Sequence, residues 1–195
     1  MKNVILILVC LCLLLGSGCG AVSTGAAAPA SPAPTEAPAP EPSEAPAPAA
    51  EPEEPYDGFR FSATDRNGGL WDQNVFASHA LTMINFWEPW CGPCVNEMPD
   101  LQRLSENYAD RGLLILGVYS TAGMEKSVDN VLRQTGVTYP ILNFCPEFQV
   151  FETGYVPTTV FVDREGNVLS ANGGAPAYVG SRSYDDWAAI VEGLL

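Results

Sequence analysis

The chain has 195 residues, of which 47% are hydrophobic, and it carries a formal net charge of −14. The length suits one ordinary domain with tails. The negative charge argues against nucleic acid as a partner, because phosphate binding needs clustered lysine and arginine side chains. Six cysteines do not make a disulfide-dense scaffold, so a disulfide here is predicted to be functional rather than structural.

Residues 1–18 have the pattern of a secretory leader. Lys2 supplies the positive start, and the apolar run from Val4 to Leu15 is too short to span a bilayer comfortably. Small residues then precede Cys19, as in the lipobox of bacterial lipoproteins, which this segment resembles. The resemblance implies cleavage before Cys19 and diacylation, and two acyl chains are enough for stable anchoring. A plain signal peptide cleaved near Ala21, or an uncleaved anchor, is the alternative.

Residues 19–56 comprise this cysteine and a linker rich in proline, alanine and glutamate. Proline removes backbone donors and fixes φ, and few large apolar side chains are available for burial. We therefore predict an extended, disordered spacer with polyproline II character and no catalytic content. The globular domain is expected over residues 57–195.

The remaining sequence alternates predicted strands and helices. Strands are expected over Phe59–Ala63, Leu81–Trp87, Leu113–Val118, Thr158–Val162 and Val168–Ala171, the last two as a hairpin. Helices are expected after Cys94, over Glu125–Thr135 with Gly136 ending it, and over Tyr184–Leu195 with Ser183 as its N-cap. This order predicts an α/β fold with a mixed central sheet and helices on both faces.

The segment Trp90-Cys91-Gly92-Pro93-Cys94 stands between a predicted buried strand and an amphipathic helix. At a helix N-terminus, free backbone N–H groups and the positive end of the dipole stabilise a thiolate. Two intervening residues in the first turn bring the second sulfur within bonding reach of the first. Proline suits that turn, where its missing N–H costs nothing. The pattern predicts a redox-active disulfide between Cys91 and Cys94.

Together with three further motifs, this segment resembles the thioredoxin superfamily, and specifically its TlpA/ResA-like extracytoplasmic branch. The motifs are Val156-Pro157-Thr158-Thr159 before a predicted strand, Asp163-Arg164-Glu165-Gly166 after it, and Glu97-Met98-Pro99. The resemblance covers residues 57–195 and implies the thioredoxin fold. It implies that Cys91 is the exposed nucleophile and that Cys94 resolves the mixed disulfide. It also implies a cis-proline loop, in which Val156 ahead of Pro157 presents its backbone to the substrate chain.

Several side chains near the motif are further candidates. Glu97 matches an acid that cytochrome-maturation members carry, and its carboxylate is expected near Cys94, whose proton it would accept. A solvated surface glutamate is the alternative. Asn85 stands where thioredoxin has a buried acid. Glu88 is expected to be a loop charge, although a negative charge near the nucleophile would oppose thiolate formation. Trp90 is expected to cover the redox pair and to contact substrate.

Outside the N-terminal segment and the redox pair, Cys145 and His79 are the remaining thiol and imidazole. Cys145 is predicted to be a buried small side chain, with a third redox thiol as the alternative. His79 is predicted to lie at the surface. A paired CxxC…CxxC spacing is absent, so we predict no metal site, and no cofactor is expected.

The resemblance implies an enzyme, a thiol–disulfide oxidoreductase anchored to the outer face of a bacterial cytoplasmic membrane. It implies reduction of extracytoplasmic protein disulfides, with a CcdA/DsbD-type membrane protein as electron donor. Apocytochrome c and methionine sulfoxide reductases are the expected substrates, although the direction of exchange depends on potential and partners. Two alternatives stay open. One is a thiol peroxidase, which needs a peroxidatic cysteine in a threonine-rich loop with an arginine partner; the other is a non-catalytic adaptor with the same fold.

Overall fold

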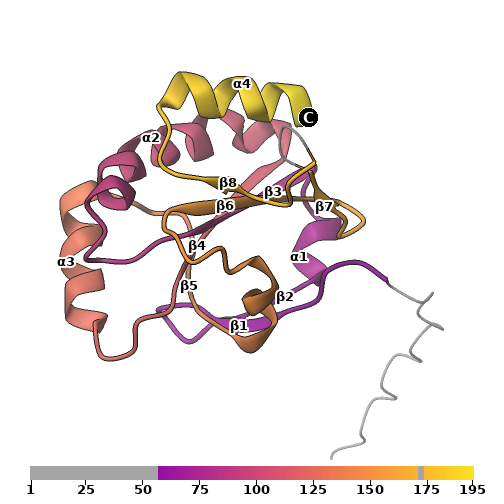
Figure 1. Cartoon of the computed structure of the whole chain (residues 1–195). Helices are drawn as coiled ribbons and strands as arrows, with labels where there is room; N and C mark the ends of the chain where they lie inside the picture. The colour runs from indigo at the N-terminus through magenta and orange to yellow at the C-terminus, as the bar shows by residue number, and fades with distance from the viewer. Residues whose placement is uncertain (1–56, 171–173) are drawn as a thin grey trace, which may run out of the picture. The chain divides into compact units, whose positions relative to one another are not determined.

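The computed structural model describes residues 57–170 and 174–195, so the predicted leader, the linker and Cys19 lie outside the described residues. Its main feature is a mixed sheet with the strand order β5-β4-β3-β6-β7, to which β8 adds by pairing with β6 (Figure 1). The strands are β3 (Leu81–Phe86), β4 (Leu113–Tyr119), β5 (Ile141–Asn143), β6 (Thr158–Asp163), β7 (Val168–Leu169) and β8 (Tyr178–Val179).

Strand β3 lies at the centre of the sheet, and all six of its residues are buried. It pairs in parallel with β4 and antiparallel with β6. A strand covered on both faces is mostly apolar, and four of the six residues of β3 are hydrophobic, the exceptions being Thr82 and Asn85. The register places Phe86 opposite both Val118 and Thr158. The redox motif therefore leaves the sheet beside the end of β4 and the start of β6.

One face of the sheet packs against α2 (Gly92–Tyr108), α3 (Glu125–Thr135) and α4 (Tyr184–Leu194), with the short 3₁₀ helix η1 (Ala109–Arg111) following α2. The other face is covered by α1 (Asn74–Ala77), the 3₁₀ helix η2 (Pro146–Phe151) and the antiparallel pair β1 (Ser62–Thr64) and β2 (Leu70–Asp72). Five phenylalanine side chains contribute to this second core, namely Phe61, Phe76, Phe86, Phe148 and Phe151. The predicted α/β fold with helices on both faces is confirmed. Within the described part of the chain, no helix has the length and apolar character that a membrane crossing requires.

The two predicted helices in the second half of the chain are found with their caps. Helix α3 ends before Gly136, whose φ of 70° is the left-handed conformation that glycine adopts without strain. Helix α4 begins after Ser183, whose hydroxyl accepts the backbone N–H of Asp186 while that carboxylate accepts the N–H of Ser183. This reciprocal capping box fixes the start of the helix.

The N-terminal strand differs from its prediction. It runs over Ser62–Thr64 instead of Phe59–Ala63, and Phe59 packs its ring 4.7 Å from that of Phe151. The aromatic side chain is thus half-buried by contact with η2 instead of taking part in strand pairing. Strand β7 ends at Leu169, and residue 171, the predicted end of the hairpin, lies outside the described residues.

Candidate active site

Cys91 and Cys94 are joined by a disulfide at the N-terminus of α2. Cys91 is the N-cap, with extended backbone angles, and its Sγ accepts the backbone N–H of Cys94 at 3.2 Å. In the reduced protein the same N–H and the helix dipole stabilise a thiolate on Cys91. Cys91 is 6% exposed and Cys94 is 1% exposed, so an incoming sulfur reaches Cys91 first.

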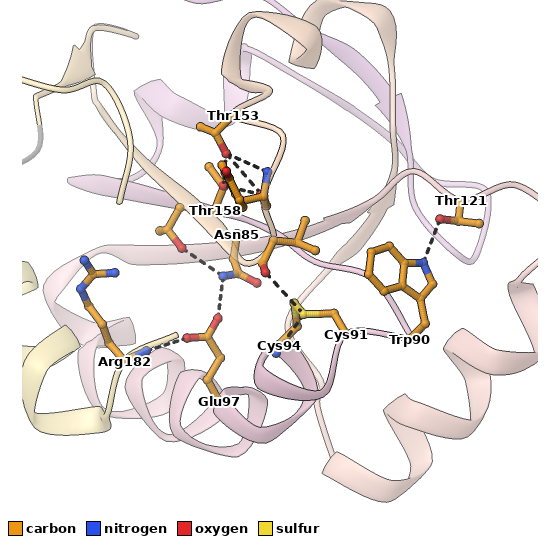
Figure 2. The surroundings of a disulfide bond; sticks show 12 residues. Asn85, Trp90, Cys91, Cys94, Glu97, Thr121, Thr153, Thr158 and Arg182 are labelled. Atoms are coloured by element: carbon orange, nitrogen blue, oxygen red, sulfur yellow. Dashed lines mark hydrogen bonds between the residues drawn. A yellow bond between two sulfur atoms is a disulfide. The ribbon is translucent and has the colours of Figure 1, made fainter. Parts of the chain in front are cut away.

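The loop before β6 lies against this sulfur. The peptide bond between Val156 and Pro157 is cis, and the Val156 carbonyl oxygen is 3.6 Å from Sγ of Cys91. Thr158 anchors the loop, because its hydroxyl donates to the Tyr155 carbonyl at 2.7 Å (Figure 2). A backbone carbonyl beside the nucleophile is the kind of acceptor with which an extended substrate chain pairs.

Trp90 lies on the opposite side of the disulfide from Glu97 (Figure 2). Its indole N–H donates to the Thr121 hydroxyl at 3.4 Å, and the side chain is 63% exposed. The ring stands beside the redox pair, and most of its surface faces solvent (Figure 2).

Glu97 projects from α2, one turn after Cys94, and is buried. The alternative of a solvated surface glutamate is therefore wrong. Its Oε2 accepts the backbone N–H of Arg182 at 3.0 Å and the indole N–H of Trp187 at 3.4 Å, while Oε1 accepts from Asn85 at 3.1 Å. Burial raises the pKa of the Glu97 carboxyl above its ordinary value. The three donors and the Arg182 charge act in the opposite direction but are outweighed.

Asn85 holds this carboxylate from the centre of the sheet. Its Nδ2 donates to Glu97 and to the Thr159 hydroxyl, at 3.1 and 3.0 Å. Asn85 cannot take up a proton, so the group that titrates on this side of the pair is Glu97. The buried phenol of Tyr139 also feels Glu97, because burial and that negative charge both raise its pKa.

Glu88 is buried, which the sequence did not predict. Its Oε1 accepts the backbone N–H of Ser120 at 2.8 Å and the Ser120 hydroxyl at 2.6 Å. Its Oε2 accepts the N–H of Thr121 at 3.4 Å. Glu88 therefore lies in the loop after β3, as expected, but its charge is buried there instead of solvated. The available signal was its place next to Trp87, at the end of a strand in which every residue is buried.

A cavity of about 360 Å³ opens beside the redox loop. Apolar side chains dominate its lining, including Phe86, Trp87, Val118, Phe144 and Phe151. Trp90 and Tyr155 also line it, and these two are 63% and 72% exposed. Exposed aromatic side chains around a hollow are typical of a surface that docks another molecule.

Cys145 and His79 lie away from these groups. Cys145 is buried in the phenylalanine-rich core, and burial together with Glu147 raises the pKa of its thiol to about 11. A thiol of this kind is a poor nucleophile at neutral pH, which agrees with the predicted buried side chain. His79 is half-buried, with Nδ1 2.8 Å from the Val75 carbonyl oxygen. No group of three or more metal-ligating side chains gathers within residues 57–170 and 174–195.

The known proteins that this chain resembles in sequence include thiol-disulfide oxidoreductases and a thioredoxin-like protein. The thiol-disulfide oxidoreductase ResA of Oceanobacillus iheyensis is 34% identical over 92 residues, which are 44% of this chain and 45% of that protein. The thioredoxin-like protein YneN of Bacillus subtilis is 33% identical over 90 residues, 43% of this chain and 51% of the relative. The chain thus spans about half the length of these curated relatives.

A solved structure agrees with the architecture. A thiol:disulfide interchange protein of the thioredoxin family from Chlorobium tepidum superposes with a TM-score of 0.59 and 26% identity. The superposed region covers 72% of this chain and 97% of the Chlorobium tepidum chain. A family model described as the AhpC/TSA family matches residues 59–171, more than half of the sequence. The protein therefore belongs to the AhpC/TSA family, with a thioredoxin fold and with ResA-type proteins among its relatives.

Proposed function

We propose that the chain is a thiol–disulfide oxidoreductase that exchanges its Cys91–Cys94 pair with disulfides of other proteins. The observation that carries this proposal is the disulfide at the N-terminus of α2, with the Val156 carbonyl 3.6 Å from the outer sulfur. The exposed rings of Trp90 and Tyr155 beside it favour a polypeptide substrate over a small thiol. Relatives named thiol-disulfide oxidoreductase ResA support the same chemistry.

In the reductive direction, the Cys91 thiolate attacks one sulfur of the substrate disulfide and forms a mixed disulfide. The second substrate sulfur leaves as a thiolate and takes up a proton. Cys94 then gives up its proton to Glu97 and attacks Sγ of Cys91, which breaks the mixed disulfide; the first substrate sulfur leaves as a thiolate and takes up that proton. The substrate leaves with two electrons and two protons, and the pair ends oxidised. A dithiol donor must then reduce Cys91–Cys94 again.

We further propose that the exchange runs in the reductive direction outside the cytoplasm. The electron donor is a membrane protein of the CcdA/DsbD type, and the substrates are apocytochrome c or methionine sulfoxide reductases. Support comes from the TlpA/ResA-like motifs around Cys91, Glu97 and Pro157 and from the names of the relatives. No cofactor is needed, because the two sulfurs carry both electrons.

Insulin reduction with dithiothreitol as electron donor tests the activity. The wild type should accelerate precipitation of the insulin chains, and Cys91→Ser should abolish the acceleration because it removes the nucleophile. Cys145→Ala is the matched control and should retain the full rate, since this thiol is buried with a raised pKa. A wild type no faster than dithiothreitol alone would contradict the proposal. Rapid peroxide consumption in a parallel assay would instead favour the thiol peroxidase.

We propose that Cys19 anchors the protein to the outer face of the membrane through two acyl chains. The basis is the apolar leader that ends in small residues before this cysteine. Cys19→Ala should release the protein from the membrane fraction or leave the leader uncleaved, as seen by fractionation and intact mass. Cys10→Ala, a change within the leader, is the control and should leave processing normal. Normal cleavage and unchanged membrane retention of Cys19→Ala would exclude the anchor.

A further inference from the structure

Glu88 is a buried carboxylate for which the exchange reaction described above has no use. It is 4% exposed, and all three of its hydrogen-bond donors come from Ser120 and Thr121, in the loop that follows β4. It takes part in none of the ion pairs that join described side chains. Burying a carboxylate without a cation is costly, and neutral residues can join two loops at a lower cost. The charge itself therefore calls for a role.

The backbone of Glu88 is joined directly to that of the nucleophile, while its carboxylate is held by the loop after β4. The backbone N–H of Cys91 donates to the Glu88 carbonyl at 3.0 Å, so the two residues close one turn. The residues on either side of Glu88 and Pro89 are also fastened to β4 and its loop. The N–H of Trp87 donates to the Val118 carbonyl at 2.9 Å, and the Trp90 indole donates to Thr121 at 3.4 Å. The negative charge is thus held at a fixed place beside the redox loop.

Nothing in the adjacent cavity neutralises this charge. The residues that line the cavity include no lysine, arginine or histidine, and its other titratable members are Glu152 and Tyr155. Two further charged groups lie on the opposite side of the pair, where Glu97 receives the Arg182 backbone N–H. Within the described residues, the charged side chains that line this cavity are therefore both carboxylates, Glu88 and Glu152.

We propose that Glu88 is a positioning residue that makes the Cys91–Cys94 pair a stronger reductant, by holding a negative charge beside the Cys91 thiolate. The proposal rests on the thiol–disulfide exchange proposed above. The Cys94 N–H and the α2 dipole stabilise the thiolate and thereby the reduced pair. A nearby negative charge acts against both, which raises the pKa of Cys91 and favours transfer of electrons to a substrate disulfide.

Glu88→Gln and Glu88→Ala remove the charge, and the glutamine keeps an acceptor for Ser120. Because Ser120 is exposed, water can satisfy its N–H and hydroxyl in the alanine variant. Both variants should lower the pKa of Cys91 by about half to one pH unit, measured from the pH dependence of iodoacetamide alkylation after reduction. In equilibrium with glutathione, the fraction of reduced pair should rise, with a change of about threefold to tenfold in the equilibrium constant.

Glu152→Gln is the matched control, since it removes a carboxylate that lines the same cavity but is exposed to water. It should leave the pKa of Cys91 and the glutathione equilibrium as in the wild type. Ser120→Ala keeps the Glu88 charge and should also leave the pKa in place. A folded Glu88→Gln or Glu88→Ala protein with wild-type values of both quantities would overturn the proposal. These measurements need no protein substrate, so failure of the insulin assay would remain a separate result.

Discussion

Cells that produce Cys94→Ser should accumulate covalent adducts between this protein and its substrates. Exchange passes through a mixed disulfide on Cys91, which the second sulfur normally resolves. Serine cannot resolve it, because an alcohol is a far weaker nucleophile than a thiolate at neutral pH. The buried position of residue 94 also keeps other thiols from taking its place. The adducts should be visible on non-reducing gels and should collapse when a reductant is added.

The double variant Cys91→Ser, Cys94→Ser is the decisive control and should form no adducts, since it has no nucleophile. Adding Cys145→Ala to the trap should leave the pattern of adducts unchanged, because that thiol is buried away from the site. Mass spectrometry of the trapped partners would identify the substrate class directly. An apocytochrome or a sulfoxide reductase among them supports the proposed role. A folded, expressed trap without adducts would favour the non-catalytic adaptor.

Glu97→Gln should remove a loss of stability that the oxidised wild type shows as the pH rises. Burial raises the pKa of Glu97 in the folded protein above 4.5, its ordinary value and that of the unfolded chain. Below that value both states carry the proton. Above it unfolding releases the proton, so the free energy of unfolding falls until the pH passes the folded pKa. Each pH unit of raised pKa corresponds to about 1.4 kcal/mol.

Urea unfolding of both proteins between about pH 4 and pH 8 measures this effect. The difference in unfolding free energy, variant minus wild type, should increase with pH. Glu192→Gln is the control with the opposite sign, because bonds from Arg111 and Tyr108 lower the pKa of that exposed carboxyl. The unfolding free energy of Glu192→Gln minus that of the wild type should be small, and it should decrease as the pH rises above the folded pKa of Glu192. Parallel curves for Glu97→Gln and wild type would show that the Glu97 pKa is not raised.

Much of the fold could be predicted because its signals are local. Strand β3 is a largely apolar segment, and Ser183 and Gly136 are cap residues whose effect depends only on their neighbours in sequence. The redox pair is equally local, since its two cysteines share one helical turn. Strands β5 and β8, with three and two residues, are too short to show a period.

The surroundings of the pair depend on contacts between distant residues, and the sequence pattern does not encode them. Glu88 meets Ser120, 32 residues away, and Glu97 meets Trp187, 90 residues away. Whether either carboxylate is buried depends on how β4 and α4 pack, which composition and periodicity do not determine. Trp90 shows the same limit, because its neighbour Thr121 belongs to another loop.

The position of the redox pair at the end of β3 also affects how the substrate preference of such a protein can change in evolution. The disulfide belongs to a helix that is packed into the core, whereas Tyr155 and Thr121 belong to loops outside the strand pairing. Substitutions in those loops alter the shape and chemistry of the cavity beside the redox pair without disturbing the hydrogen bonds of the sheet. Selection can therefore change the choice of partner through the loops, while the bond-exchanging sulfurs remain in an unaltered frame.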